Sequence, residues 1–219
     1  MLRRQPPRNL LSGNAYLIVT EGQKTEPDYF VGLRDQLKLS SIDVEITPAD
    51  GTDPVSIVNY AVSLRDQRKQ SAKRDIATPN YDAVWAVFDT ERADTNQKLN
   101  DALQRAAARQ ISVALSNPAF EYWILLHYEF TTASFLDCWA VIKRIKEQGH
   151  IPDYAKGSTP VEEMIKRIAD AVKHAGQCRQ SHVGCQTDAE HFWNPYTQVD
   201  RLVTELNEAT RPHLQLQLD

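Results

Sequence analysis

Four short apolar runs, each followed by a segment of helical periodicity, organise the first 130 residues of this 219-residue chain. The runs lie at residues 15–20, 44–47, 83–88 and 111–115. They are rich in β-branched and aromatic residues and are short, which is typical of buried strands. Strands that alternate with helices form a mostly parallel sheet covered by helices. The sequence therefore predicts an α/β fold.

The remaining periodic segments are predicted to be helices. They span residues 28–38, 54–69, 97–109, 117–129, 134–148, 160–175 and 197–209. We expect Thr25 to cap the first of them, no strand after about residue 130, and a loop over residues 176–196. The predicted organisation is a flexible arm (1–14), an α/β core (15–130) and a helical C-terminal part (131–219) that packs on the core.

Composition excludes several classes of protein. No run of about 18 apolar residues is present, which argues against a membrane span, and residues 1–14 lack the apolar core of a secretory signal. Three cysteines do not suggest a disulfide framework and favour the cytoplasm. The net charge of −4 means that any nucleic acid must be held by a local basic face. No P-loop motif is present, so we expect no ATP hydrolysis by this chain.

Acidic residues follow two of the predicted strands. Glu21 comes directly after the first, with Gly22 beside it, and Asp89 and Glu91 follow the third. The carboxyl ends of parallel strands meet at one edge of a sheet, where ligands bind. Three carboxylates there suit an oxygen-ligated Mg²⁺ or Mn²⁺ ion. The alternative for Asp89 is a cap on the following helix.

Two other groups of residues have a functional and a plain interpretation. Cys178, His182 and Cys185 are of types that bind zinc, but their spacing matches no standard structural site, and polar loop residues are the alternative. Basic residues gather in two clusters that either contact phosphates or form solvated helix faces. The first cluster, which we expect to border the crevice, is Arg65, Arg68, Lys69, Lys73 and Arg74; the second is Lys143, Arg144 and Lys146.

Four segments resemble the RloB family, which is linked to bacterial restriction and abortive-infection loci and is similar to Toprim domains. They are LIVTEGQKTEPDYF (17–30), VFDTE (87–91), NPAFEYWILLHYE (117–129) and NPYTQVDRLV (194–203). The resemblance implies a Toprim-like, Rossmann-like core in which a glutamate follows the first strand and a D-x-D pair follows a later one. Glu21 and Asp89 match this pattern. Glu91 stands where the second aspartate would be, which keeps a carboxylate but lengthens its reach.

The resemblance and the residue types together suggest roles. Asp89 and Glu91 would hold the metal ion, with Glu21 as a further ligand or as a general base. Lys24 is a candidate phosphate contact or a solvated loop lysine. Glu121 lies in an otherwise apolar helix and is a candidate site residue, because a buried charge needs a partner. His127, further along that helix, is expected to be a core histidine.

The leading functional hypothesis is a metal-dependent nuclease of an antiviral, abortive-infection system. It would cleave RNA such as tRNA, or DNA, and the resemblance implies a separate ATPase partner protein. The alternative is a non-catalytic Toprim-like subunit that recognises a partner protein or a phage component. A hydrolase of small phosphorylated molecules is a third hypothesis.

Overall fold

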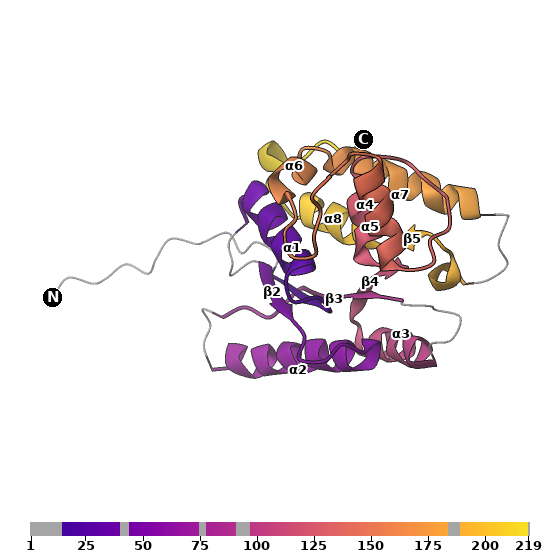
Figure 1. Ribbon diagram of the computed structural model, residues 1–219. Coiled ribbons are helices and arrows are strands. Elements are labelled where there is room, and N and C mark those ends of the chain that lie inside the picture. Colours follow the sequence, from indigo (N-terminus) through magenta and orange to yellow (C-terminus); the bar gives the residue numbers. More distant parts are fainter. Residues whose placement is uncertain (1–14, 40–43, 75–77, 91–96, 184–188, 219) are drawn as a thin grey trace.

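A five-stranded sheet forms the centre of the protein, in the order β2-β1-β3-β4-β5 (Figure 1). The computed structural model describes residues 15–39, 44–74, 78–90, 97–183 and 189–218. The strands are β1 (Tyr16–Thr20), β2 (Val44–Pro48), β3 (Ala83–Asp89), β4 (Ser112–Asn117) and β5 (Tyr196–Thr197). β1 to β4 are parallel, so the predicted α/β class is confirmed. The expected arm over residues 1–14, Glu91 and Cys185 lie outside the described residues.

β5 shows that the expectation of no strand after residue 130 is wrong. It pairs antiparallel with the end of β4, and the Ser116 and Thr197 hydroxyls lie 2.9 Å apart across the pair. A two-residue strand is too short to show the alternation by which strands are recognised in a sequence. Its pairing is set by the tertiary structure.

Helices cover both faces of the sheet. They are α1 (Thr25–Gln36), α2 (Pro54–Ala72), α3 (Gln97–Arg109), α4 (Phe120–Leu126), α5 (Cys138–Glu147), α6 (Val161–Ile165), α7 (Ile168–His182) and α8 (Val199–Glu208), with short 3₁₀ turns at Glu190–Phe192 and Pro212–Leu214. α2 and α3 lie below the sheet in Figure 1, and α1 and the helices from α4 onward lie above it. α1 connects β1 to β2, and α2 connects β2 back past β1 to β3, so right-handed crossovers in opposite directions place α1 and α2 on opposite faces.

The strands alternate between two hydrophobic clusters. Leu17 and Val19 of β1 belong to the cluster beneath the sheet with Ile57 of α2, whereas Ile18 faces the cluster above it with Trp123 of α4. This is the two-residue period of a sheet buried on both sides. The upper cluster also contains residues of α5, α7 and α8, so the C-terminal helices share a core with the sheet. Among the described residues, no helix combines the length and the apolar character needed to cross a membrane.

The single helix predicted over 160–175 is divided into α6 and α7, and α7 continues to His182, which includes part of the expected loop over 176–196. Its buried residues Ala171, Ala175, Cys178 and His182 lie at intervals of four, three and four, which is the spacing of one helix face. Because Cys178 and His182 belong to this face, it does not stand out as an apolar stripe in the sequence. The predicted cap at Thr25 is also wrong: α1 begins at Thr25 itself, and its N-cap residue, Lys24, makes no side-chain cap bond.

His127 is a satisfied core histidine, as expected. It is fully buried, its Nδ1 lies 2.9 Å from the carbonyl oxygen of Trp123, and its Nε2 lies 3.2 Å from the Tyr29 hydroxyl. A carbonyl only accepts, so Nδ1 carries the proton and Nε2 accepts from Tyr29. Burial lowers the pKa of His127 to about 4, and the ring is therefore neutral at pH 7.

This pKa predicts acid sensitivity. The unfolded chain takes up a proton near the ordinary histidine pKa, whereas the folded protein does so only near pH 4. The stability that the folded protein gains from a neutral, buried His127 is therefore fully present above about pH 6.5. About 3 kcal/mol of the free energy of unfolding is lost as the pH falls toward 4. Urea unfolding from pH 7 to pH 4 should show a smaller loss in His127→Phe than in the wild type. Equal losses would contradict this account.

A second prediction concerns the ion pair between Arg179 of α7 and Asp200 of α8. Arg179 Nη1 donates to Asp200 Oδ1 over 2.8 Å and to the Thr197 carbonyl over 3.2 Å, and the Asp200 side chain is 5% exposed. Arg179→Ala leaves a buried charge unpaired and should lower the free energy of unfolding by about 3–5 kcal/mol. Arg201→Ala, which breaks an exposed pair with Glu190, is the matched control and should cost less than about 1 kcal/mol.

Candidate functional site

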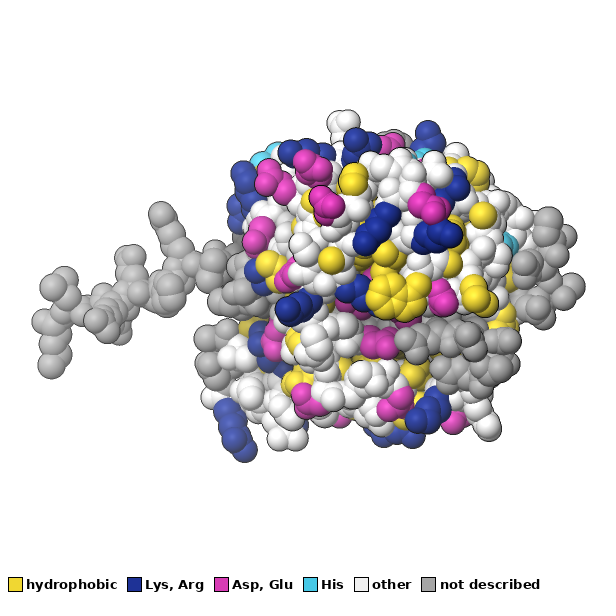
Figure 2. Space-filling view, viewed as in Figure 1, with side chains coloured by type: hydrophobic (Ala, Val, Ile, Leu, Met, Phe, Trp, Pro, Cys, Tyr) yellow, Lys and Arg dark blue, Asp and Glu magenta, His cyan; other side chains and the backbone are white. Residues whose placement is uncertain are grey.

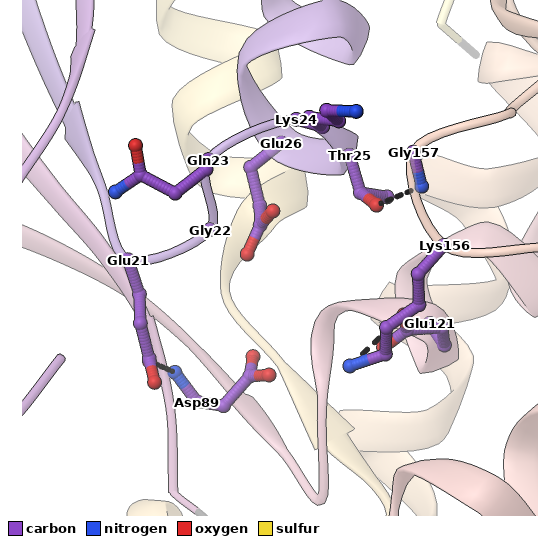
Figure 3. A pocket seen from close by; sticks show the side chains of 10 residues that line it. All are labelled: Glu21, Gly22, Gln23, Lys24, Thr25, Glu26, Asp89, Glu121, Lys156 and Gly157. Atoms are coloured by element: carbon purple, nitrogen blue, oxygen red, sulfur yellow. Dashed lines mark hydrogen bonds and ion pairs between the residues drawn. The ribbon is translucent and has the colours of Figure 1, made fainter.

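A cavity of about 280 Å³ lies at the carboxyl ends of β1 and β3 (Figure 3). The chain leaves β1 toward β2 on one side and returns to β3 on the other, so this edge is the switch point of the sheet, where ligands bind in open α/β folds. The lining residues are Glu21, Gly22, Gln23, Lys24, Thr25, Glu26, Asp89, Glu121, Lys156 and Gly157. Four of the five predicted site residues lie here; the fifth, Glu91, is outside the described residues.

Glu21 and Asp89 are joined by a hydrogen bond. The backbone amide of Asp89 donates to Glu21 Oε2 over 2.9 Å, and the Glu21 amide donates to the Val87 carbonyl over 2.9 Å. Figure 3 shows the Glu21 side chain extended toward the backbone of residue 89, whereas the Asp89 carboxylate turns into the cavity. The first acid therefore holds the end of the strand that carries the second. Asp89 also lies eight residues before the start of α3, so it does not cap that helix.

The electrostatics of Asp89 are those of a crowded acidic site. Burial raises its pKa well above the ordinary aspartate value, and the charges of Glu21, Glu26 and Glu121 raise it further, while Lys156 lowers it. Like charges near one carboxylate disfavour its ionised form. Such perturbation is concentrated at functional sites, because stability alone does not select for it.

Glu26 is a lining residue that the sequence reasoning missed. It is 7% exposed, and Figure 3 shows its carboxylate directed from α1 toward Asp89. Burial raises its pKa, and nearby Glu121 adds to the increase. Gly22 makes this position accessible: a Cβ on residue 22 would lie 1.9 Å from Glu26 Oε2. The predicted helix began at residue 28, whereas α1 begins at Thr25 and has Glu26 in its first turn, beside the end of β1. The earlier helix start is the signal that identifies Glu26 as a site residue.

Glu121 is 2% exposed in the first turn of α4 and has three partners. Lys156 Nζ lies 3.5 Å from its Oε1, the Tyr154 hydroxyl donates to Oε1 over 3.4 Å, and the Cys138 thiol donates to Oε2 over 3.5 Å. These contacts offset the cost of burying the charge. α4 therefore carries into the cavity an acidic side chain whose oxygens have partners.

Lys156 was also missed, because it lies far along the chain from the acidic segments. It belongs to a tight turn in which Ala155 and Ser158 pair, and Gly157 has a φ of +76°, which favours glycine. The Gly157 amide donates to Thr25 Oγ1 over 3.0 Å, so this turn is attached to the start of α1. Thr25, expected as a cap, instead holds the turn that carries Lys156.

The oxygen donors of the cavity suit a hard divalent cation. Glu21, Glu26, Asp89 and Glu121 provide carboxylates, the ligand type that Mg²⁺ and Mn²⁺ prefer. Within the described ranges, however, no three or more His, Cys, Asp or Glu side chains are arranged closely enough to hold an ion. The residue types of the cavity suit the ion, but the described side chains alone do not form a site for it, and Glu91 lies outside the described residues.

The residues considered for zinc have other partners. Cys178 accepts from the Tyr122 hydroxyl over 3.1 Å, and its thiol donates to the Pro195 carbonyl over 3.4 Å. His182 Nε2 lies 2.9 Å from the same carbonyl, and its ring stacks on Trp193. Both side chains pack where α7 meets the segment before β5, whereas Cys185 is outside the described residues.

The first basic cluster does not border the crevice, so that expectation is wrong. Arg65 donates to the carbonyl of Arg109 just before β4, and Arg68 donates to that of Pro79 over 2.8 Å, just before β3. Both contacts lie at the amino ends of the strands, opposite the cavity. The reason is that α2 runs antiparallel to the strands and ends at that edge.

The close approach of Gly22 and Glu26 yields a prediction. Gly22→Ala places a methyl group where the Glu26 carboxylate lies, so that carboxylate must leave its position. We expect weaker Mn²⁺ binding by isothermal titration calorimetry with little change in melting temperature. Gly176→Ala on α7, where a Cβ meets nothing within 4 Å, is the control. Wild-type Mn²⁺ affinity in Gly22→Ala would contradict the proposed importance of this contact.

Comparison with known proteins places the chain in a family. Searches of curated proteins and of solved structures gave no match. A family model described as RloB-like protein matches residues 16–206, a span that includes all of the lining residues of the cavity. The chain therefore belongs to the RloB-like protein family.

Proposed function

We propose that this protein is a metal-dependent nuclease that cleaves phosphodiester bonds in RNA, such as tRNA, or in DNA, as part of a bacterial antiviral, abortive-infection system. The observation that carries the proposal is the Asp89 carboxylate, turned into a cavity with three further acids and Lys156 at the switch point of the sheet. Membership of the RloB-like family, with its resemblance to Toprim domains, supports it.

The proposed roles combine the geometry of the cavity with the residue types and the family resemblance. Glu21 fixes the backbone at Asp89, and both are proposed ligands of a Mg²⁺ or Mn²⁺ ion together with Glu91. When bound, such an ion polarises a phosphate oxygen and activates water. Glu21 is alternatively the general base, Lys24 is a proposed phosphate contact at the start of α1, and Glu121 orders the far side of the cavity. A separate ATPase would supply control, as the family resemblance suggests.

The acidic cluster should cost stability when no metal ion is bound. The pKa of Asp89 is raised in the folded protein, so folding loses stability as the pH rises through that pKa. Asp89→Asn removes the repelled charge and should raise the melting temperature in EDTA at pH 8 by a few degrees. Adding Mn²⁺ should raise the melting temperature of the wild type but not of the variant. A lower melting temperature for Asp89→Asn in EDTA would contradict this.

The decisive test of activity is cleavage. Purified protein is incubated with tRNA, total RNA and plasmid DNA in Mg²⁺, in Mn²⁺ and in EDTA. We expect metal-dependent cleavage of at least one substrate, reduced at least 100-fold in Glu21→Ala and in Asp89→Ala. Glu162→Ala, whose side chain is 92% exposed, is the control and should cleave as the wild type does.

Two results would count against the assignment. Equal activity in wild type and Glu21→Ala would indicate a contaminating nuclease. No cleavage in any condition, with the ATPase partner added, would favour the alternative of a non-catalytic Toprim-like subunit that recognises a partner protein or phage component.

A further inference from the structure

The cavity has a feature that its acids alone do not explain. A phosphodiester carries a negative charge and is repelled by Glu21, Glu26, Asp89 and Glu121. The proposed metal ion would offset part of this repulsion, and a cationic side chain close to the carboxylates would offset more of it. The lining residues of the cavity include two lysines, Lys24 and Lys156.

The two lysines are placed differently. The side chain of Lys24 lies along the turn at Gly157, where a Cβ on residue 157 would be 2.8 Å from Lys24 Cδ. Figure 3 shows its ammonium group directed away from Asp89. The ammonium group of Lys156 instead points toward the acidic centre, 3.5 Å from Glu121 Oε1.

Lys156 is held firmly yet remains accessible. Its turn is attached to α1 through the Gly157–Thr25 hydrogen bond, and Glu121, at 3% side-chain exposure, anchors its ammonium group. The Lys156 side chain is nevertheless 51% exposed, so a ligand can reach it. An ammonium group has three donors and can bind Glu121 and a phosphate oxygen together. Burial lowers the pKa of Lys156, but Glu121, Cys138 and Asp89 raise it, and the net direction is upward.

We propose that Lys156 contacts a non-bridging oxygen of the substrate phosphate at this site. The inference rests on the proposed nuclease function and adds a substrate-binding residue to it. Lys156 neutralises the charge that the carboxylates would repel, and Glu121 keeps its ammonium group in the cavity. Lys24 contributes less to binding the substrate phosphate, because its ammonium group is directed away from Asp89.

The test is the salt dependence of binding. Fluorescein-labelled 20-nucleotide single-stranded RNA and DNA are titrated with protein in Ca²⁺, which is chosen to limit cleavage, and anisotropy is measured between 50 and 200 mM KCl. Each phosphate contact contributes about 0.7 to the slope of log K against log salt for single strands. Lys156→Met should lose about one such contribution and bind several-fold more weakly at 50 mM salt, whereas Lys156→Arg should keep most of the slope.

The matched control is Lys166→Met, because Lys166 pairs with Glu162 on the surface at 3.8 Å and is 69% exposed. It should leave the slope unchanged. An unchanged slope and affinity in Lys156→Met, or an equal loss in Lys166→Met, overturns the role of Lys156 while the nuclease proposal stands. If the wild type neither binds nor cleaves these nucleic acids, the nuclease proposal falls and the Lys156 assignment falls with it. Melting temperatures of both variants within a few degrees of the wild type show that the fold is retained.

Discussion

The hydrogen bond from the Asp89 amide to the Glu21 carboxylate is the contact on which the candidate site depends. It joins the ends of β1 and β3 at the switch point, where the chain leaves β1 toward β2 and leaves β3 toward β4 in opposite directions. Strand ends at such a point have no helix between them, so a cavity forms. The bond fixes the backbone from which the Asp89 carboxylate enters that cavity. Glu26, Glu121 and Lys156 line the same cavity.

Three further elements bring charge to the same place. α1 contributes Glu26, whose carboxylate occupies the space that a Cβ on residue 22 would fill. α4 contributes Glu121, and the turn at Ala155–Ser158 contributes Lys156. The result is a group of carboxylates whose ionised forms are disfavoured, because burial raises the pKa values of Asp89 and Glu26 and the neighbouring carboxylates raise them further. A fold gains nothing from such repulsion in the absence of a ligand. A group of carboxylates at a site open to solvent is what a cation-binding centre requires.

Much of the fold and part of the site followed from the sequence. The apolar runs indicated the four parallel strands because short apolar runs between helical segments are typical of such strands, and β1 and most of β3 are indeed buried on both faces. The acids after two of the runs indicated Glu21 and Asp89 because parallel strands end at one edge. β5 and the last turns of α7 did not follow, since a two-residue strand has no period and a helix face built with Cys178 and His182 does not look apolar. Glu26 and Lys156 depend on where α1 begins and on a turn docked through Thr25, which only the tertiary structure specifies.

The central claim is that the carboxylates at this junction bind a divalent metal ion. A crystal soaked in Mn²⁺ and measured at a wavelength where manganese scatters anomalously tests it most directly. The account predicts an anomalous peak in the cavity at about 2.1–2.2 Å from an oxygen of Asp89, with Glu21, Glu26 or Glu91 as a second ligand. An ordered cavity without a peak, or a peak elsewhere on the protein, would contradict it.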